Sequence, residues 1–280
     1  MLRTIRKIQN SAKIKFYVDS IINFLFYVND ISIIALLRIR YLFSNKNSFH
    51  SFVLITAADS SHFTSLIQLL RSAHDKLVNP DIIFYNLGLK NDELNQLDRE
   101  FPNLKIKNFN YSKYPDYFNI KINAGEYAWK PVIIHREVTQ NEKPILWMDA
   151  GNVITNKMKM FDIYIHYFGF YSPYSSNNIQ KWTHPSTLNF YGFDKKMQNK
   201  RNLNGAIIGI NKNFSSVLNL SESLHDNALK KHVIAPEGSS RENHRQDQAL
   251  LTLEFYQKLN FKFFLKTNKI FGVKIHQDLD

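Results

Sequence analysis

From residue 52 to residue 109, apolar runs of strand length take turns with segments of helical periodicity. Residues 52–58, 81–87 and 104–109 read as strands, the first as a continuous apolar run and the third as an alternating one. Residues 62–77 and 92–101 place apolar side chains at helical spacing. This order predicts parallel strands joined by right-handed crossovers, which is one mononucleotide-binding half of an α/β fold.

The pattern continues beyond residue 110 with more widely spaced elements. Further strands are expected at residues 145–149, 169–172, 203–210 and 273–275. Further helices are expected at residues 124–140, 158–167, 215–231 and 246–259. Residues 111–123, 173–200 and 235–245 are predicted to be irregular. We therefore expect a Rossmann-like mixed sheet flanked by helices.

Residues 1–47 differ from the rest of the chain. An apolar run at residues 21–37 is flanked by basic residues, and eight Lys and Arg against two Asp give the segment a formal charge of +6. Asn29 and Asp30 inside the run would be costly in hydrocarbon. Three interpretations stay open: a basic amphipathic helix pair on a membrane, which we favour, a helical hairpin packed on the catalytic domain, or a signal anchor. The boundary is placed near residue 48, which separates an appendage, 1–47, from one domain, 48–280.

Composition and charge limit the classes of function that the chain can have. The formal net charge of +12 suits an anionic partner such as nucleotide phosphates, an anionic membrane surface or nucleic acid. The absence of cysteine excludes disulfides, thiolate chemistry and Cys-ligated zinc, and is consistent with a reducing compartment. The chain has neither a GxGxxG nor a GxxxxGK[ST] motif, which disfavours a dinucleotide oxidoreductase and a P-loop NTPase.

Two blocks of candidate chemistry follow predicted strands. The small residues Thr56, Ala57 and Ala58 would let a flat base approach the backbone, and Asp59 could bond a ribose or a base. Asp149 ends the strand at residues 145–149, where a carboxylate could hold Mg²⁺ or Mn²⁺. The alternative for both Asp residues is an ordinary capping or turn role.

Two further blocks lie at predicted helix starts. Lys130, within Tyr127-Ala128-Trp129-Lys130-Pro131, could neutralise a diphosphate. Near residue 246, Arg245 could bind a phosphate, and Asp247 and Gln248 could accept hydrogen bonds from sugar hydroxyls. The alternatives are a solvated surface lysine and the usual stabilisation of a first helical turn.

In this order the four blocks resemble the GT-A type of nucleotide-sugar glycosyltransferase. They are most similar to family 8 and to an uncharacterised domain family with YAWKP and D-A-G blocks. The resemblance implies a GT-A-like fold over residues 52–276, with residues 56–59 on the nucleoside and Lys130 on the diphosphate. It also implies that Asn204-Gly205-Ala206 line the sugar pocket and that Asp247-Gln248 approach the donor sugar.

The family's metal motif, D-x-D, here reads Asp149-Ala150-Gly151, so the second acidic residue is missing. The resemblance makes His276 a candidate metal ligand beside Asp149. Two routes stay open. Either Asp149 and His276 hold Mn²⁺ or Mg²⁺ with diphosphate oxygens and waters, or Lys130, Arg245 and other cations offset the charge of the leaving group.

The expected activity is sugar transfer from a nucleotide diphosphate sugar to a hydroxyl acceptor, with retention by analogy to family 8. Trp182 and His184 are candidate acceptor contacts, because aromatic faces stack on sugars. We expect a glycan or lipid-linked acceptor, in capsule, lipopolysaccharide or glycolipid synthesis. The expected location is cytoplasmic, peripheral at the inner face of the membrane, and no nucleic acid is expected. The alternatives are a nucleotidyl- or phosphotransferase and a non-catalytic basic module.

Overall fold

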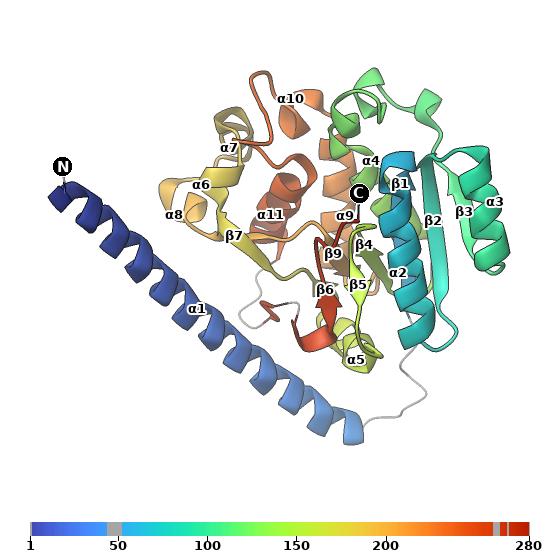
Figure 1. The fold of residues 1–280 in the computed structure, drawn as a ribbon, viewed down its shortest axis with the longest axis horizontal. Helices are drawn as coiled ribbons and strands as arrows, with labels where there is room; N and C mark the ends of the chain where they lie inside the picture. Colours follow the sequence, from blue (N-terminus) through green and yellow to red (C-terminus); the bar gives the residue numbers. More distant parts are fainter. Residues whose placement is uncertain (1, 44–51, 260–263, 268, 280) are drawn as a thin grey trace.

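The computed structural model describes residues 2–43, 52–259, 264–267 and 269–279. A six-stranded sheet in the order β3-β2-β1-β4-β9-β6 forms the centre of the molecule, with helices on both faces (Figure 1). The predicted fold class, a mixed α/β sheet flanked by helices and preceded by a helical appendage, is confirmed.

The first half of the sheet is parallel, as predicted. Its strands are β1 (Val53–Asp59), β2 (Asp81–Gly88), β3 (Lys105–Asn108) and β4 (Ile145–Met148). The helices α2 (Phe63–Lys76), α3 (Asn91–Glu100) and α4 (Trp129–Gln140) connect them. β1 and β4 are neighbours, so the residues that follow them meet at one edge of the sheet.

Antiparallel strands complete the sheet. β9 (Ile207–Ile210) pairs with β4, and β6 (Phe170–Tyr171) pairs with β9. The helices of this half are α5 (Lys159–Phe168), α9 (Ser215–Ala228), α10 (Lys231–Ile234) and α11 (Gln246–Lys258). Short 3₁₀ turns lie at η2 (Ser60–His62), η3 (Tyr111–Lys113), η4 (Asp116–Phe118), η5 (Asn123–Tyr127) and η6 (Lys269–Phe271).

The strand predicted over residues 203–210 is confirmed at residues 207–210, which form β9, but not at residues 204–206. β8 (Arg201–Leu203) pairs with β7 (Tyr174–Asn178) in a separate ribbon, and residues 204–206 lead from it into β9. This link carries Asn204, whose side chain accepts a hydrogen bond from the Ala206 N–H at 2.8 Å and so bends the chain.

The prediction that residues 173–200 are irregular is also wrong. Besides β7, the segment forms α6 (Ile179–Trp182), α7 (Pro185–Tyr191) and α8 (Lys195–Gln198). These helices are too short for periodicity to reveal them. A side chain caps each start, and the capping residues are Asn178, His184 and Asp194.

The hydrophobic core has two layers, one on each face of the sheet. Val53 and Ile55 of β1 face the layer that includes residues of α4, α9 and α11. Leu54 faces the layer that includes residues of α2 and α5. Because successive strand residues point to opposite faces, a fully apolar β1 fits a strand that is covered on both sides.

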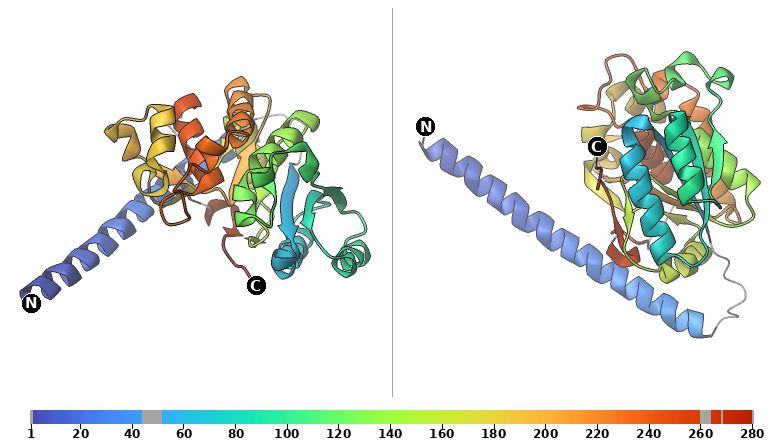
Figure 2. Two further views of the ribbon diagram at one scale, coloured as in Figure 1. Left: turned by 90° about the horizontal axis from the view of Figure 1, so that it is seen from above. Right: turned by 45° about the vertical axis from the view of Figure 1, so that its right-hand side comes forward.

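The N-terminal appendage is one helix, α1 (Leu2–Leu42), so the prediction of a helix pair or a hairpin is wrong (Figures 1 and 2). No Gly or Pro interrupts residues 2–42. The predicted boundary near residue 48 and the side chains of the basic residues before Tyr17 lie outside the described residues. The part of α1 after residue 19 is not amphipathic, because apolar side chains lie both against the domain and in solvent.

One stripe of α1 packs on the domain. Ile33, Ile34 and Leu37 are buried in the same layer as α5. Asp30 is fully buried and accepts hydrogen bonds from the Thr267 N–H at 2.8 Å and from the Lys266 N–H at 3.0 Å. The polar residue that would be costly in a bilayer therefore fastens α1 to the domain.

The outward face of α1 is apolar. Its exposed large hydrophobic side chains are Tyr17, Ile21, Phe24, Leu25, Tyr27, Val28, Ile31, Leu36, Ile39 and Leu42. Among the described residues one stretch, Ser20–Leu42, is long and apolar enough to cross a membrane by length and composition. Signal sequences and core helices meet the same criterion.

Candidate functional site

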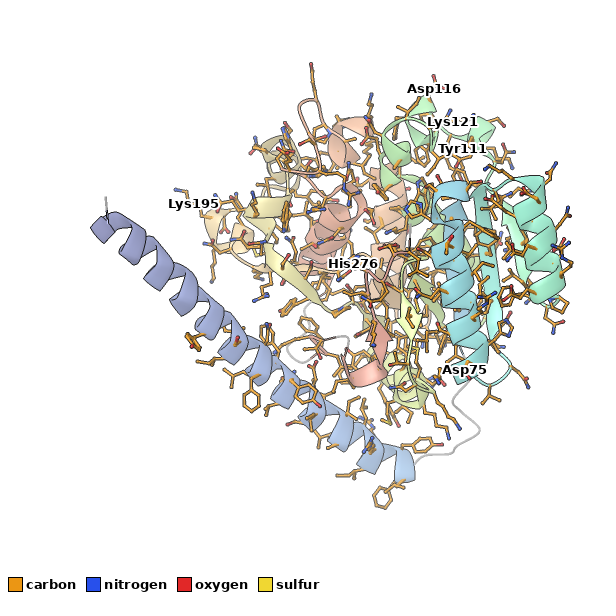
Figure 3. All side chains as sticks on the ribbon, viewed as in Figure 1. Asp75, Tyr111, Asp116, Lys121, Lys195 and His276 are labelled. Atoms are coloured by element: carbon orange, nitrogen blue, oxygen red, sulfur yellow. The ribbon has the colours of Figure 1, made fainter. Side chains whose placement is uncertain are left out.

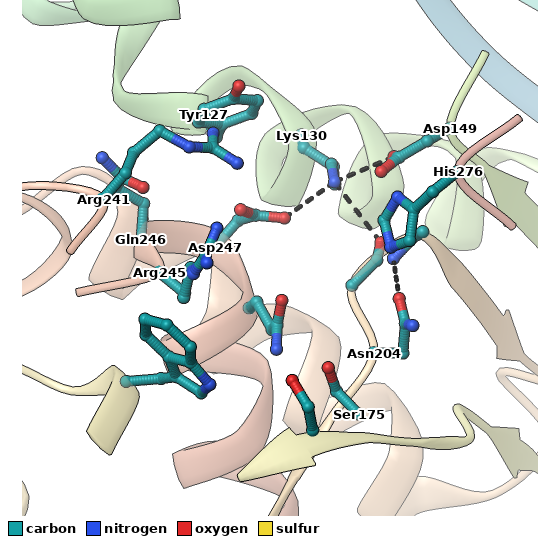
Figure 4. Close-up of a pocket in the computed structure, with 15 residues that line it drawn as sticks. Tyr127, Lys130, Asp149, Ser175, Asn204, Arg241, Arg245, Gln246, Asp247 and His276 are labelled. Atoms are coloured by element: carbon teal, nitrogen blue, oxygen red, sulfur yellow. Dashed lines mark hydrogen bonds and ion pairs between the residues drawn. The ribbon is translucent and has the colours of Figure 1, made fainter. Parts of the chain in front are cut away.

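Two adjoining cavities open at the edge of the sheet where β1 and β4 end. The larger, of about 450 Å³, is lined by Ala57, Ala58 and Asp59 from β1. The smaller, of about 200 Å³, lies at residues 204–206 and the start of α11 (Figure 4). The residues that line both cavities are Tyr127, Lys130, Asp149, Arg241 and His276. The two cavities thus form one cleft, and these shared residues mark its junction.

Lys130 occupies the centre of the junction. Its Nζ atom lies 2.9 Å from Oδ1 of Asp149 and 2.8 Å from Oδ2 of Asp247, and it donates a hydrogen bond to the Gly205 carbonyl at 3.3 Å (Figure 4). The residue is only 4% exposed. The first turn of α4 fixes its backbone, with Pro131 next to it where a proline is tolerated.

Burial opposes the charge of Lys130, but the attraction of Asp149 and Asp247 outweighs it and raises the pKa of the ammonium. Burial raises the pKa of Asp247, and the nearby Asp149 adds to that rise while Lys130 opposes it. Lys130 is therefore a permanent cation that joins two carboxylates from different elements.

Asp149 is held on several sides. The Trp147 Nε1–H donates to its Oδ1 at 2.8 Å, and its own N–H donates to the Ala206 carbonyl at 3.0 Å. The buried Asn152 side chain donates to the same carbonyl at 2.7 Å. Two hydrogen bonds therefore join the end of β4 and the turn after it to the link at residues 204–206.

Gly205 lets α11 approach this link. A Cβ atom on Gly205 would lie 3.1 Å from Oδ2 of Asp247 and 3.3 Å from Cβ of Gln248. The small residue is thus a packing requirement of the Lys130–Asp247 contact.

The C-terminal tail closes one side of the cleft. β10 (Val273–Lys274) pairs with β5 (Val153–Ile154), so the predicted strand at residues 273–275 is confirmed. The tail then donates from the Gln277 N–H to the Gly151 carbonyl at 2.7 Å. It brings His276 into both cavities and Asp278 into the larger one, and Figure 3 shows His276 near the middle of the molecule.

The described side chains of the cleft do not form a binding site for a divalent cation. Among the described residues, no group of three His, Cys, Asp or Glu side chains could hold a metal ion. Oδ1 of Asp149 is already taken by Lys130 and Trp147. Gly151 offers no side chain, and the space that a side chain there would fill holds the carboxylate of Asp278. The residues present therefore do not fit a metal centre of the D-x-D type.

Two arginines line the cleft opposite Lys130. The Arg241 guanidinium lies 5.0 Å from the Tyr127 ring centroid, and the Arg245 guanidinium lies 4.2 Å from that of Trp182. Within the described part of the chain neither has a carboxylate within ion-pair distance. Partial burial lowers the pKa of Arg245, and repulsion from Arg241 lowers it further. The pair is thus uncompensated positive charge.

His244 fixes the loop that carries these arginines. The residue is fully buried, its Nε2–H donates to the Ile234 carbonyl at 2.8 Å, and its Nδ1 accepts from the His184 N–H at 3.1 Å. This bonding requires the neutral ring. Burial lowers the pKa of His244 to about 4.

Most of the predicted site residues meet in the cleft. Those on the smaller cavity are Lys130, Asp149, Trp182, Asn204, Gly205, Ala206, Arg245, Asp247, Gln248 and His276. Ala57, Ala58 and Asp59 line the larger one. Thr56 and His184 line neither: Thr56 is buried within β1, and His184 caps α7. The functional roles given to all of these residues stay predictions.

Sequence reasoning gave no role to several lining residues, among them Ser175, Ser176, Arg241 and Asp278. One signal was available for Arg241. It lies four residues before Arg245 in the same predicted polar loop. A second arginine so close to a candidate phosphate ligand could have been predicted to bind the same anion.

A family model described as a protein of unknown function, DUF1647, matches residues 7–135, which is less than half of the chain. No curated protein sequence matches the chain. The predicted likeness to family 8, and to the domain family with YAWKP and D-A-G blocks, stays a prediction.

Several solved glycosyltransferases are similar in structure. The bifunctional glycosyltransferase WbbM, in its apo form, has 12% identity and a TM-score of 0.47, over 78% of this chain and 40% of that one. GlyE of Streptococcus pneumoniae TIGR4 has 12% identity and a TM-score of 0.42, over 75% and 44%. The galactosyltransferase LgtC, in complex with donor and acceptor sugar analogs, has 13% identity and a TM-score of 0.43, over 73% and 70%. The chain spans less than half the length of WbbM and GlyE, and at these TM-scores the likeness carries no functional conclusion.

Proposed function

We propose that the chain is a glycosyltransferase that moves a sugar from a nucleotide diphosphate sugar to a hydroxyl acceptor. The observation that carries the proposal is the two-part cleft, whose junction holds a buried lysine between two carboxylates from different elements. A nucleotide sugar has a base at one end, a diphosphate in the middle and a sugar at the other end. This order matches a cleft with two cavities whose junction is also lined by Arg241.

The larger cavity would take the nucleoside. Ala57 and Ala58 at the end of β1 leave room for a flat base, and the Asp59 carboxylate can accept hydrogen bonds from a ribose. Ligands bind in open α/β sheets outside the carboxyl ends of the strands, which is where these residues lie.

The smaller cavity would take the sugar. Its polar lining includes Asn204, Asp247 and Gln248, which offer the acceptors and donors that sugar hydroxyls need. In the reaction the bond from the anomeric carbon to the phosphate oxygen breaks, and its electron pair leaves with the nucleoside diphosphate. The acceptor oxygen forms the new bond, and its proton goes to the departing phosphate oxygen. Asp247 would stabilise the positive charge that develops on the sugar.

The test is the release of nucleoside diphosphate from a panel of UDP-, GDP- and CDP-sugars in the presence of mixed glycan acceptors. Asp247→Asn should lower turnover by about 100-fold or more. Asp98→Asn on exposed α3 is the matched control and should leave turnover unchanged. Release of pyrophosphate or transfer of phosphate would overturn the proposal in favour of a nucleotidyl- or phosphotransferase. The anomeric configuration of the product would test retention.

We further propose that the apolar outward face of α1 rests on a membrane surface, which would place the cleft near lipid-linked or surface-polysaccharide acceptors. The full chain should float with anionic phospholipid vesicles. Phe24→Glu with Val28→Glu should weaken flotation, whereas Lys121→Glu, an exposed charge reversal in the catalytic domain, should weaken it less. Equal flotation of all variants would contradict this location.

A further inference from the structure

The charged side chains of the cleft do not cancel one another. One ammonium at Lys130 against the carboxylates of Asp149 and Asp247 leaves that cluster with a formal charge of −1. Lys130 therefore cannot by itself attract a diphosphate, because its charge is already spent on protein partners. The remaining Lys, Arg, Asp or Glu side chains of the smaller cavity are Arg241 and Arg245, which bring the formal charge of these residue types in its lining to +1.

The position of the two guanidinium groups suits a phosphate. Arg241 lines both cavities and so lies at the junction, while Arg245 lines only the sugar side. Each rests on an aromatic ring, which orients the planar fork and reduces the entropy lost on binding. Arginine forks bind phosphate oxygens in a bidentate manner.

A divalent cation would usually supply this neutralisation. The described residues do not fit one, because Oδ1 of Asp149 is engaged by Lys130 and no group of three His, Cys, Asp or Glu side chains among them could hold a metal ion. The second acidic position of the motif is Gly151. The same cleft thus lacks a metal cage and has two arginines with no carboxylate partner in the described chain.

We propose that this chain binds its donor without a divalent cation, and that Arg241 and Arg245 neutralise the diphosphate. The inference rests on the proposed function. In the transfer step the β-phosphate oxygen gains the electron pair of the broken glycosidic bond, and the two guanidinium groups stabilise that added charge. No metal ion takes part in this step.

The experiment measures thermal stabilisation of the full chain by UDP, GDP, CDP and ADP, first in EDTA and then with Mn²⁺ or Mg²⁺. Binding to the native state raises the melting temperature by mass action. We expect one nucleoside diphosphate to give the same shift in EDTA as with metal. Calorimetry should then show no Mn²⁺ binding to the nucleotide complex beyond that of free nucleotide.

Variants locate the effect. Arg241→Ala and Arg245→Ala should each weaken nucleoside diphosphate binding about 10-fold or more, and the corresponding Lys variants should recover part of the loss. Nucleoside binding should change little. Arg99→Ala on exposed α3 is the matched control for net charge and should bind as wild type does.

The outcomes separate the two proposals. A shift that EDTA abolishes and Mn²⁺ restores would overturn the metal-free proposal and leave the transferase proposal standing. Wild-type affinity in both alanine variants would also overturn it. A folded protein that no nucleotide stabilises under either condition would overturn both.

Discussion

The carboxylate of Asp278 lies in the space that a side chain at Gly151 would fill. An ideal Cβ atom on Gly151 would be 2.0 Å from Oδ1 of Asp278. Gly151 and Asp278 therefore pack against each other, and a larger residue at position 151 would require the tail to shift.

We expect Gly151→Ala to displace the tail while the domain stays folded, because Asp278 lies in an exposed segment, residues 276–279. Protease cleavage or amide exchange at residues 275–279 should increase, with a small change in melting temperature. In an Asp278→Ala background the same substitution should have a smaller effect, because the overlapping atoms are gone. Equal effects in both backgrounds would contradict the contact.

Removing the cation of the cleft should destabilise the domain. Lys130→Met leaves Asp149 and Asp247 without their shared partner, and we expect a loss of about 2–4 kcal/mol in the free energy of unfolding, reduced by the partial exposure of Asp149. Urea denaturation measures this loss. Adding Asp247→Asn should recover part of it, and no recovery would show that the loss comes from packing.

His244 should make the domain sensitive to acid. Its pKa is about 4 in the fold and 6.5 when unfolded, so the unfolded chain binds more protons between these values. Stability is then complete above pH 6.5 and falls, by up to about 3 kcal/mol, as the pH drops to 4. His244→Gln should flatten this part of the stability profile, whereas His232→Gln, an exposed change, should keep it.

Asp162 should have the opposite dependence on pH. Burial raises its pKa from 3.8 to about 7, and its Oδ1 atom has no hydrogen-bond partner among the described residues. The folded state therefore binds more protons between these values, and stability falls as the pH rises through them. We expect Asp162→Asn to raise the melting temperature at pH 8 and to have little effect at pH 4. A destabilised variant at pH 8 would contradict this assignment.

The Asp30 carboxylate should hold α1 on the domain. Asp30→Ala leaves the Lys266 and Thr267 N–H groups without their acceptor, at a cost of about 1–3 kcal/mol each if they stay buried. Amide exchange in α1 should increase, and so should exchange at residues 266–267. Asn23→Ala, on the exposed side of the helix, should leave both unchanged.

Local patterns predicted the sheet and the two central residues of the cleft. Asp149 follows an apolar run, and Lys130 precedes a proline in a first helical turn, so neighbouring residues alone place both. Their contact with Asp247 also follows once the end of β4 and the start of α11 meet at one edge. The chemistry at the ends of strands is thus accessible to sequence reasoning.

Features that depend on distant partners were not predictable. Asn29–Asp30 looks like a break in an apolar helix until its partners at Lys266 and Thr267 are known. Arg241 reaches the cleft because the buried His244 anchors its loop. Asp278 enters because β10 pairs with β5. Each of these positions is set by a contact across the sequence, and periodicity carries no information about it.

The buried Asp30 links the outer helix to the wall of the cleft. Asp30 accepts hydrogen bonds from the Lys266 and Thr267 N–H groups, which lie shortly before the strand β10. This strand leads to His276, which lines the cavity. A change in how α1 packs on the domain would therefore act first on residues 266–267, which precede the strand that carries His276.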